Sequence, residues 1–393
     1  MIAVDELRRA VGAVTDPELR RPIAELDMLR SVSADGATAH VEIALTIVGC
    51  PAAARIEREV RDAAASVPGV AAVDLTVGVM TPAERAALTE RLRGGRGGHG
   101  RAMPFGPEAL TRVIAVTSGK GGVGKSTLTA NLAVCLAARG LSVGLVDADV
   151  HGFSIPGLLG LVGDDGLPPQ PTRIDDLMLP PVAYGVKTIS IGMFLPRPPQ
   201  PRPAAAVAWR GPMLHRTVQQ FLTDVFFGDL DILLIDMPPG TGDVAISVGQ
   251  LLPHAEVLVV TTPQTAASDV AVRSGLVAAQ TGQRVIGVVE NMAAVTLPDG
   301  TSLDLFGSGG GRAVAAALSE SLAAARGAKA ADAVPLLGSV PLSVALRRGG
   351  DAGVPVVVSD PADAAAQDIS RIAASLAHSA RGLAGRPLPV TPA

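Results

Sequence analysis

The stretch that decides the fold reads VIAVTSGKGGVGKST and occupies residues 113–127. Its first four residues are an apolar strand candidate, and the glycine-rich loop that follows fits the pattern GxxxxGK[ST]. Leu128, Leu132 and Leu136 then continue at helical spacing. Glycines let backbone N–H groups turn inward around phosphate oxygens, and the N-terminus of the helix adds partial positive charge. This order of strand, loop and helix predicts a phosphate-binding P-loop.

The charged and hydroxyl residues of the loop have separate expected roles. Lys125 is expected to bridge the β- and γ-phosphates of ATP, and Ser126 to ligate Mg²⁺. Lys120 follows the first glycine and gives the loop a deviant form (KGGVGKST), although its charge alone fits a solvated loop lysine equally well. The expected nucleotide contacts within the loop are Gly119, Lys120, Gly121, Gly122, Val123, Gly124, Lys125, Ser126 and Thr127.

Short apolar segments alternate with helical segments on the carboxyl side of the P-loop. Runs as apolar as residues 232–235 suit strands that are buried on both faces, as in a parallel, doubly wound α/β sheet. The fold class expected is therefore a P-loop NTPase domain with a mostly parallel sheet. The strands expected are residues 113–117, 143–147, 188–191, 232–236, 257–261, 285–289 and 336–340.

Polar side chains follow several of these strands where each one ends. Asp149 is expected to orient an attacking water and Asp147 to hold a Mg²⁺-bound water, with capping of the following turn as the alternative for both. Asp236 closes an apolar strand, which is the Walker B arrangement that contacts the metal through water. Asn291 follows the strand at 285–289, a suitable place for an amide to read the edge of adenine.

The residues before the P-loop read as a separate small α/β domain. Helical spacing and strand alternation predict helices at 4–14 and from Pro51, and strands at 28–32, 39–47 and 70–79. The expected divisions are a small domain at 1–93, a Gly-rich linker at 94–107, the P-loop domain at 108–384 and a frayed tail at 385–393. Residues 161–203 are proline-rich, and we expect them to include a mobile surface excursion.

The composition excludes several classes of partner. The formal net charge is -4 and aromatic residues are 2% of the chain, so neither a basic field nor base-stacking platforms favour nucleic acid. No uncharged apolar run reaches the ~20 residues of a membrane span. Two cysteines cannot form a disulfide framework. We expect a cytoplasmic chain without nucleic-acid or membrane partners.

Several motifs together resemble the Mrp/ApbC family of ATP-binding iron–sulfur carrier proteins, within the deviant-Walker group that includes MinD, ParA and the nitrogenase iron protein. The likeness covers nearly the whole chain. The small domain is also similar to a module shared by iron–sulfur assembly factors. The motifs are the P-loop, DADVHGFSIP (147–156), WRGPM (209–213), QQFL (219–222), DMPPGTGD (236–243), VENM (289–292) and FGSGGG (306–311), with DPE (16–18) and GCP (49–51) in the small domain.

This resemblance implies roles for residues of the nucleotide site. Lys120 would reach across a homodimer to the partner's nucleotide, Asp149 would be the switch aspartate, and Asn291 would read adenine. ATP hydrolysis with Mg²⁺ would drive opening of the dimer. Apo iron–sulfur proteins or other assembly factors would be the partners.

The chain departs from the family where a cluster is usually held. Family members that carry clusters usually have CxxC shortly after the ENM segment, whereas residues 292–300 read MAAVTLPDG. A cluster normally takes four thiolates, so a site shared by a dimer needs two from each subunit. Cys135 is expected in the core. Cys50 precedes a helix start, where the dipole can lower a thiol pKa, and it is either an iron ligand of a [4Fe–4S] cluster or an inert cysteine.

Three functions fit these observations. The first is an ATP-hydrolysing iron–sulfur cluster carrier or scaffold, and the second is an ATP-gated dimeric switch that regulates a partner without a cluster. The third, a positioning ATPase like MinD or ParA, needs a basic amphipathic membrane helix or a basic DNA-binding surface. Residues 368–381 are rich in Ala and Ser with few cations, which disfavours the third function.

Overall fold

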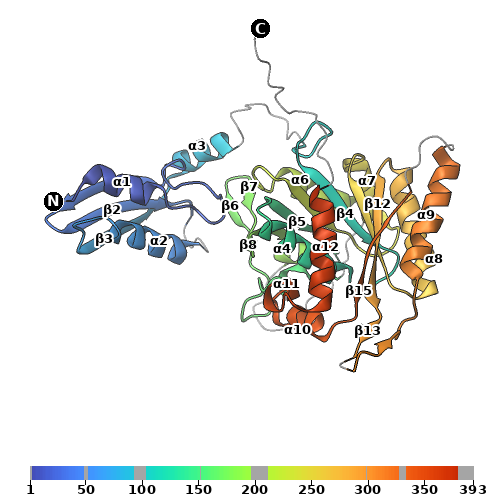
Figure 1. The fold of residues 1–393 in the computed structure, drawn as a ribbon. Helices are drawn as coiled ribbons and strands as arrows, with labels where there is room; N and C mark the ends of the chain where they lie inside the picture. Colours follow the sequence, from blue (N-terminus) through green and yellow to red (C-terminus); the bar gives the residue numbers. More distant parts are fainter. Residues whose placement is uncertain are drawn as a thin grey trace, which may run out of the picture. The chain divides into compact units, whose positions relative to one another are not determined.

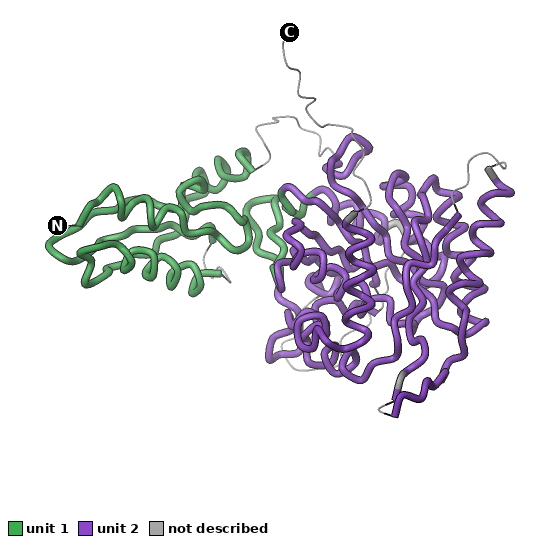
Figure 2. Tube along the Cα trace, in the orientation of Figure 1, with its two compact units in different colours: residues 1–101, 171–182, 224–228 green, residues 102–170, 183–223, 229–393 purple. Residues whose placement is uncertain are grey.

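The computed structural model of the chain contains two compact units, each with its own core (Figures 1 and 2). The small unit comprises residues 1–101, 171–182 and 224–228, and the large unit comprises residues 102–170, 183–223 and 229–393. The structure describes residues 2–47, 52–92, 103–150, 152–195, 211–297, 299–326 and 333–378. Among the helices in these ranges, none combines the length and the apolar character required to cross a bilayer.

The large unit is built on an eight-stranded sheet in the order β15-β12-β11-β4-β10-β5-β9-β8. Every pairing from β15 to β9 is parallel, so the α/β fold with a mostly parallel sheet is confirmed. The strands are β4 (Arg112–Ser118), β5 (Val143–Asp147), β8 (Val182–Ala183), β9 (Val186–Ser190), β10 (Ile232–Asp236), β11 (Glu256–Thr261), β12 (Arg284–Ala293) and β15 (Leu336–Pro341).

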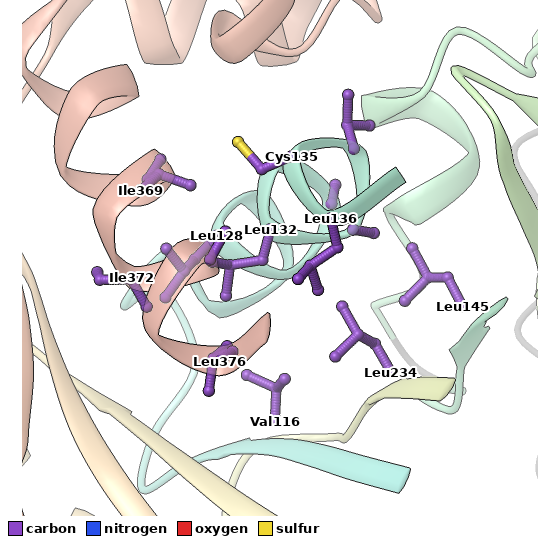
Figure 3. Packing of buried hydrophobic residues seen from close by; sticks show 14 of the residues in the cluster. Val116, Leu128, Leu132, Cys135, Leu136, Leu145, Leu234, Ile369, Ile372 and Leu376 are labelled. Carbon is purple, nitrogen blue, oxygen red and sulfur yellow. The ribbon is translucent and has the colours of Figure 1, made fainter. Parts of the chain in front are cut away.

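Helices cover both faces of this sheet because its central strands are apolar on both sides. On one face, α12 (Ala364–His378) packs through Ile369, Ile372 and Leu376 against α4 (Lys125–Ala138), as Figure 3 shows. On the other face, Thr117 of β4 shares a 2.7 Å hydrogen bond with Ser274 of α8. The remaining elements are α5 (Ile155–Leu158), η1 (Ile191–Phe194), α6 (Gly211–Thr223), α7 (Asp243–Leu251), α8 (Thr265–Gln280), β13 (Val295–Thr296), β14 (Ser302–Leu303), α9 (Gly310–Arg326), α10 (Val344–Ala352) and α11 (Val356–Ser359).

The small unit contains a three-stranded sheet in the order β1-β2-β3. β1 pairs antiparallel with β2, and β2 pairs parallel with β3. Alternation along β2 buries Val41 and Ile43, while His40 and Glu42 lie on the more open face. Its elements are α1 (Val4–Gly12), β1 (Leu29–Asp35), β2 (Thr38–Leu45), α2 (Ala53–Ala65), β3 (Ala72–Val79) and α3 (Pro82–Leu92).

A hairpin from the proline-rich stretch completes the core of the small unit. Its strands are β6 (Thr172–Ile174) and β7 (Leu177–Leu179), which pair antiparallel. Ile174, Leu177 and Leu179 are buried in the same cluster as Leu7 and Ile23. The sequence does not predict this hairpin, because strands of three residues are too short to show periodicity. Residues 196–203 lie outside the described residues.

A buried hydrogen bond joins this hairpin to the DPE motif. The Thr172 hydroxyl donates to Glu18 Oε1 at 2.9 Å. Burial raises the pKa of Glu18 to about 7, the Thr172 bond opposes that shift, and the neighbouring Asp16 carboxylate adds to it. Asp16 itself accepts the backbone N–H groups of Glu18 and Leu19 at 2.9 and 2.8 Å. The protonated form of Glu18 is therefore favoured far more than in an exposed glutamate.

The raised pKa of Glu18 predicts that the stability of the small unit depends on pH. The folded unit prefers the protonated carboxyl, so this contribution is fully present below the unfolded value of 4.5 and is lost as the pH rises through about 7. We expect the free energy of unfolding, from urea titrations of the full chain, to fall by at most about 3 kcal/mol between pH 5 and pH 8 from this group. Glu18→Gln stays neutral and should remove that part of the pH dependence. An identical pH dependence in wild type and variant would contradict the assignment.

Candidate nucleotide-binding site

The P-loop lies between β4 and α4, and two of its glycines are required by close approach. A Cβ added to Gly119 would overlap the backbone of Val270 and Ala271 in α8. Gly124 has φ +77°, and a Cβ there would overlap the side-chain amide of Asn291. The loop is therefore seated directly against α8 on one side and against the end of β12 on the other.

Lys125 and Ser126 meet Asp236 at the carboxyl ends of the central strands. Lys125 Nζ donates to Asp236 Oδ1 at 2.7 Å, and the Ser126 hydroxyl donates to Oδ2 at 2.6 Å. The Thr129 hydroxyl, one turn along α4, donates to Asp236 Oδ1 at 3.0 Å. β10 is adjacent to β4 in the sheet, with Asp236 in register with Val116. The expected P-loop lysine, P-loop hydroxyl and Walker B carboxylate are thus brought together.

Asp147 lies beside Asp236 because β5 pairs with β10 in register at these two residues. Burial raises the pKa of Asp147 to about 7, and the Asp236 charge adds to the shift. Hydrogen bonds from the Ser190 hydroxyl at 3.0 Å and from the Asp149 backbone N–H at 3.2 Å oppose it. A divalent cation nearby would favour the ionised form of Asp147.

The oxygen groups of this cluster fit a hard cation. Mg²⁺ prefers a few carboxylate and hydroxyl ligands and keeps several of its waters. Ser126, Asp147 and Asp236 would hold it here, in part through water. When bound, the ion would supply charge neutralisation for the β- and γ-phosphates.

Asp149 caps the turn that follows β5. Its Oδ1 accepts the backbone N–H of Gly152 at 3.0 Å. This contact matches the turn-capping alternative, and the role of Asp149 in orienting water stays a prediction.

Asn291 is almost fully buried at the end of β12, and its amide is tied to the P-loop. Its Nδ2 donates to the Val123 carbonyl at 2.8 Å. The preceding Glu290 accepts the backbone N–H of Gly311 at 2.7 Å and the Ser339 hydroxyl at 3.1 Å. Asn291 of the VENM motif therefore anchors the P-loop to β12. Recognition of adenine by Asn291 stays a prediction.

The loop after β10 is hydrogen-bonded to the carboxyl end of β4, just before the P-loop. The backbone N–H of Met237 donates to the Val116 carbonyl at 3.0 Å, and that of Gly240 donates to the Ser118 carbonyl at 2.8 Å. The start of the DMPPGTGD loop is therefore fixed beside the strand that leads into the P-loop.

Lys120 contacts a residue that the sequence analysis did not single out. Its Nζ donates to Gln264 Oε1 at 3.0 Å. Gln264 lies immediately before α8, three residues beyond the end of β11. Its position just past a strand that ends beside the P-loop is the signal that could have identified it.

Of the two cysteines, only Cys135 lies among the residues that the structure describes. Cys50 lies outside the described residues. Cys135 is 7% exposed in the core between α4 and α12 (Figure 3), which confirms the expectation of a core residue. Its Sγ lies 3.4 Å from the Ser370 hydroxyl, and burial raises the pKa of the thiol. Within the described ranges, no three His, Cys, Asp or Glu side chains are grouped so that they could hold a metal ion.

Comparison with known families adds to this geometry. A family model described as ParA, NUBPL iron-transfer P-loop NTPase, matches residues 109–377. The chain belongs to the NUBPL iron-transfer P-loop NTPase family. A second model, described as iron–sulfur cluster assembly protein, matches residues 5–75 of this NUBPL-family NTPase.

Full-length relatives agree with that membership. An iron–sulfur cluster carrier protein of Mycobacterium tuberculosis (strain ATCC 25618 / H37Rv) is 52% identical over 98% of this chain and 96% of its own length. One from Synechocystis sp. is 39% identical over 96% and 98%. A solved nucleotide-binding protein of Archaeoglobus fulgidus, in complex with ADP, is 34% identical over 62% of this chain and 86% of that chain, with a TM-score of 0.43. The family models and the two carrier-protein relatives confirm the resemblance inferred from the motifs.

The position of Lys125 predicts that Lys125→Ala abolishes ATP turnover in this NUBPL-family NTPase. The variant loses the cation that is expected to contact the phosphates and leaves Asp236 buried without its ion pair. We expect phosphate release to fall at least about 100-fold, as when a group that stabilises the transition state is removed. Arg139→Ala, which removes an exposed cation just beyond the other end of α4, is the control and should retain turnover. Full activity in Lys125→Ala would contradict the site.

Proposed function

We propose that this chain is an ATP-hydrolysing iron–sulfur cluster carrier that transfers clusters to apoproteins. The observation that carries the proposal is the convergence of Lys125, Ser126 and Asp236 at one edge of the sheet. This site occurs in a chain whose relatives over nearly its full length are named iron–sulfur cluster carrier proteins.

The chemistry proposed for the site is ATP + H₂O to ADP + phosphate. Lys125 stabilises the charge that develops on the transferred phosphoryl group, and Asp149 positions the attacking water. Ser126, Asp147 and Asp236 hold Mg²⁺. Turnover in an isolated subunit is low because Lys120 acts on the nucleotide of the partner subunit.

The working form proposed is a cytoplasmic homodimer. Its partners are apo iron–sulfur proteins or other assembly factors, with no role for nucleic acid or membrane. The matching iron–sulfur assembly model over residues 5–75 supports this class of partner.

Cys50 is the proposed cluster ligand of the chain. Cys135 is unsuited because it is buried and its thiol has a raised pKa, whereas the thiolate is the form that binds metal. A homodimer then supplies two Cys50 thiolates. A [4Fe–4S] cluster takes four, so the other two ligands come from a partner protein or a small thiol.

An ATP-gated switch without a cluster is the second candidate function. The observation that favours it is the absence of cysteine from residues 292–300, together with the burial of Cys135. A positioning ATPase is disfavoured, since Ile369, Ile372 and Leu376 of α12 pack in the core and leave that face of the helix unavailable to a membrane.

Anaerobic reconstitution with iron and sulfide tests the carrier proposal against the switch. We expect stable iron with a charge-transfer absorbance in the wild type and in Cys135→Ala, and its loss in Cys50→Ala, with iron counted per dimer. Cys135→Ala is the matched control because it removes the other thiol of the chain. No iron in the wild type, with ATPase activity intact, would favour the switch. Equal iron in Cys50→Ala would refute Cys50 as the ligand.

Lys120→Ala tests the proposed action across the dimer. We expect association in a non-hydrolysable ATP analogue to weaken by about 10-fold or more, because a charged hydrogen bond contributes roughly 1.5–3 kcal/mol. Light scattering at several protein concentrations measures the dimer dissociation constant. Calorimetry on the same variant should show nearly unchanged nucleotide binding by the single subunit, and an unaltered dimer would contradict the role.

A further inference from the structure

The contact between Lys120 and Gln264 is not used by the nucleotide chemistry described above. Gln264 occupies the N-cap position of α8, yet its side chain makes no capping bond to that helix. Its Oε1 accepts from Lys120 Nζ at 3.0 Å instead. The amide of Gln264 is thus directed to the lysine of the P-loop rather than to its own helix.

The backbones of the two residues are held close together by packing on α8. Lys120 follows Gly119, which is seated against the backbone of Val270 and Ala271. Gln264 immediately precedes the same helix. Both backbones are therefore fixed on the same helix, so only side-chain freedom is lost when Lys120 and Gln264 meet.

A second contact fixes the backbone around Gln264. A Cβ added to Gly310 would lie 2.6 Å from the Pro263 carbonyl oxygen, so only glycine permits this approach. The Ser268 hydroxyl of α8 also lies 3.4 Å from the Gly310 carbonyl. Gln264 is consequently held between the P-loop and the FGSGGG motif.

Because Gln264 is a neutral acceptor, a charged acceptor can replace it as the hydrogen-bond partner of Lys120. Within the described part of the chain, no carboxylate lies at ion-pair distance from Lys120, and the partner that holds it is a neutral amide. A carboxylate would add the attraction of a full negative charge to this hydrogen bond. Phosphate oxygens carry charge and can therefore displace glutamine as the partner of Lys120.

We infer that Gln264 is a positioning residue that hydrogen-bonds Lys120 within its own subunit. When two subunits associate, Lys120 leaves Gln264 and binds the phosphates of the nucleotide in the other subunit. This inference rests on the proposed function, in which Lys120 acts across the dimer. Closure of a symmetric dimer breaks this bond in both subunits. The strength of the bond therefore sets the protein concentration at which the ATP-bound dimer forms.

Two substitutions that change the bond in opposite directions test the inference. Gln264→Ala frees Lys120 and should lower the dimer dissociation constant in a non-hydrolysable ATP analogue by about 30-fold or more, since a net hydrogen bond of about 1 kcal/mol no longer has to be broken in each of the two subunits. Gln264→Glu should raise that constant. Gln280→Glu adds the same charge at the exposed far end of α8 and should leave it unchanged.

Two further measurements separate positioning from a structural role. The thermal midpoint and the nucleotide affinity of the single subunit should be unchanged in Gln264→Ala, and Lys120→Ala/Gln264→Ala should associate as weakly as Lys120→Ala alone. Dimer constants that shift in the same direction for Ala and Glu, or that do not shift, overturn the inference while the carrier proposal stands. A normal dimer in Lys120→Ala overturns both the inference and the action across the dimer.

Discussion

The ion pair between Lys125 and Asp236 is the constraint around which the nucleotide site is built. Asp236 is 1% exposed and Lys125 is 5% exposed, and an isolated charge at such depth costs several kcal/mol. Asp147 places a second buried carboxylate beside this pair, and its pKa is raised mainly by burial and further by the Asp236 charge. The Lys125 ammonium offsets part of the cost of burying Asp236. Asp236 lies beside Asp147 and close to the P-loop because β10 lies between β5 and β4, with Asp236 in register with Asp147 and Val116.

The conformation of the P-loop depends on contacts with other elements as well as on its own glycines. Its first glycine is seated on α8, and its Val123 carbonyl accepts the amide of Asn291 from β12. Both contacts come from elements far along the chain. A site held in this way keeps its donors aligned before phosphate arrives, which is what electrostatic stabilisation of phosphoryl transfer requires.

The core of the small unit also includes residues that lie far away in the sequence. Ile174, Leu177 and Leu179 belong to its core although they follow the P-loop in the sequence. A unit of about 100 residues buries a modest fraction of its surface, so a few added apolar side chains matter to its stability. Glu18 and Thr172 join the two parts of this core through a buried hydrogen bond. The core of the small unit is thus built from stretches of chain that lie far apart in the sequence.

Local pattern was enough to predict the P-loop, the parallel sheet and the carboxylates at the ends of β5 and β10, because glycine spacing and apolar runs act over a few residues. The hairpin at 172–179 could not be predicted, since its strands are too short to show a period. Nor could the pairing of Lys120 with Gln264, which are 144 residues apart and meet only when β11 packs against β4. The sequence by itself determined which groups the site contains. Only the tertiary structure decided which of these groups are in contact and which carboxylates are buried away from solvent, because the contacts depend on strand order and the loss of solvent depends on depth of burial.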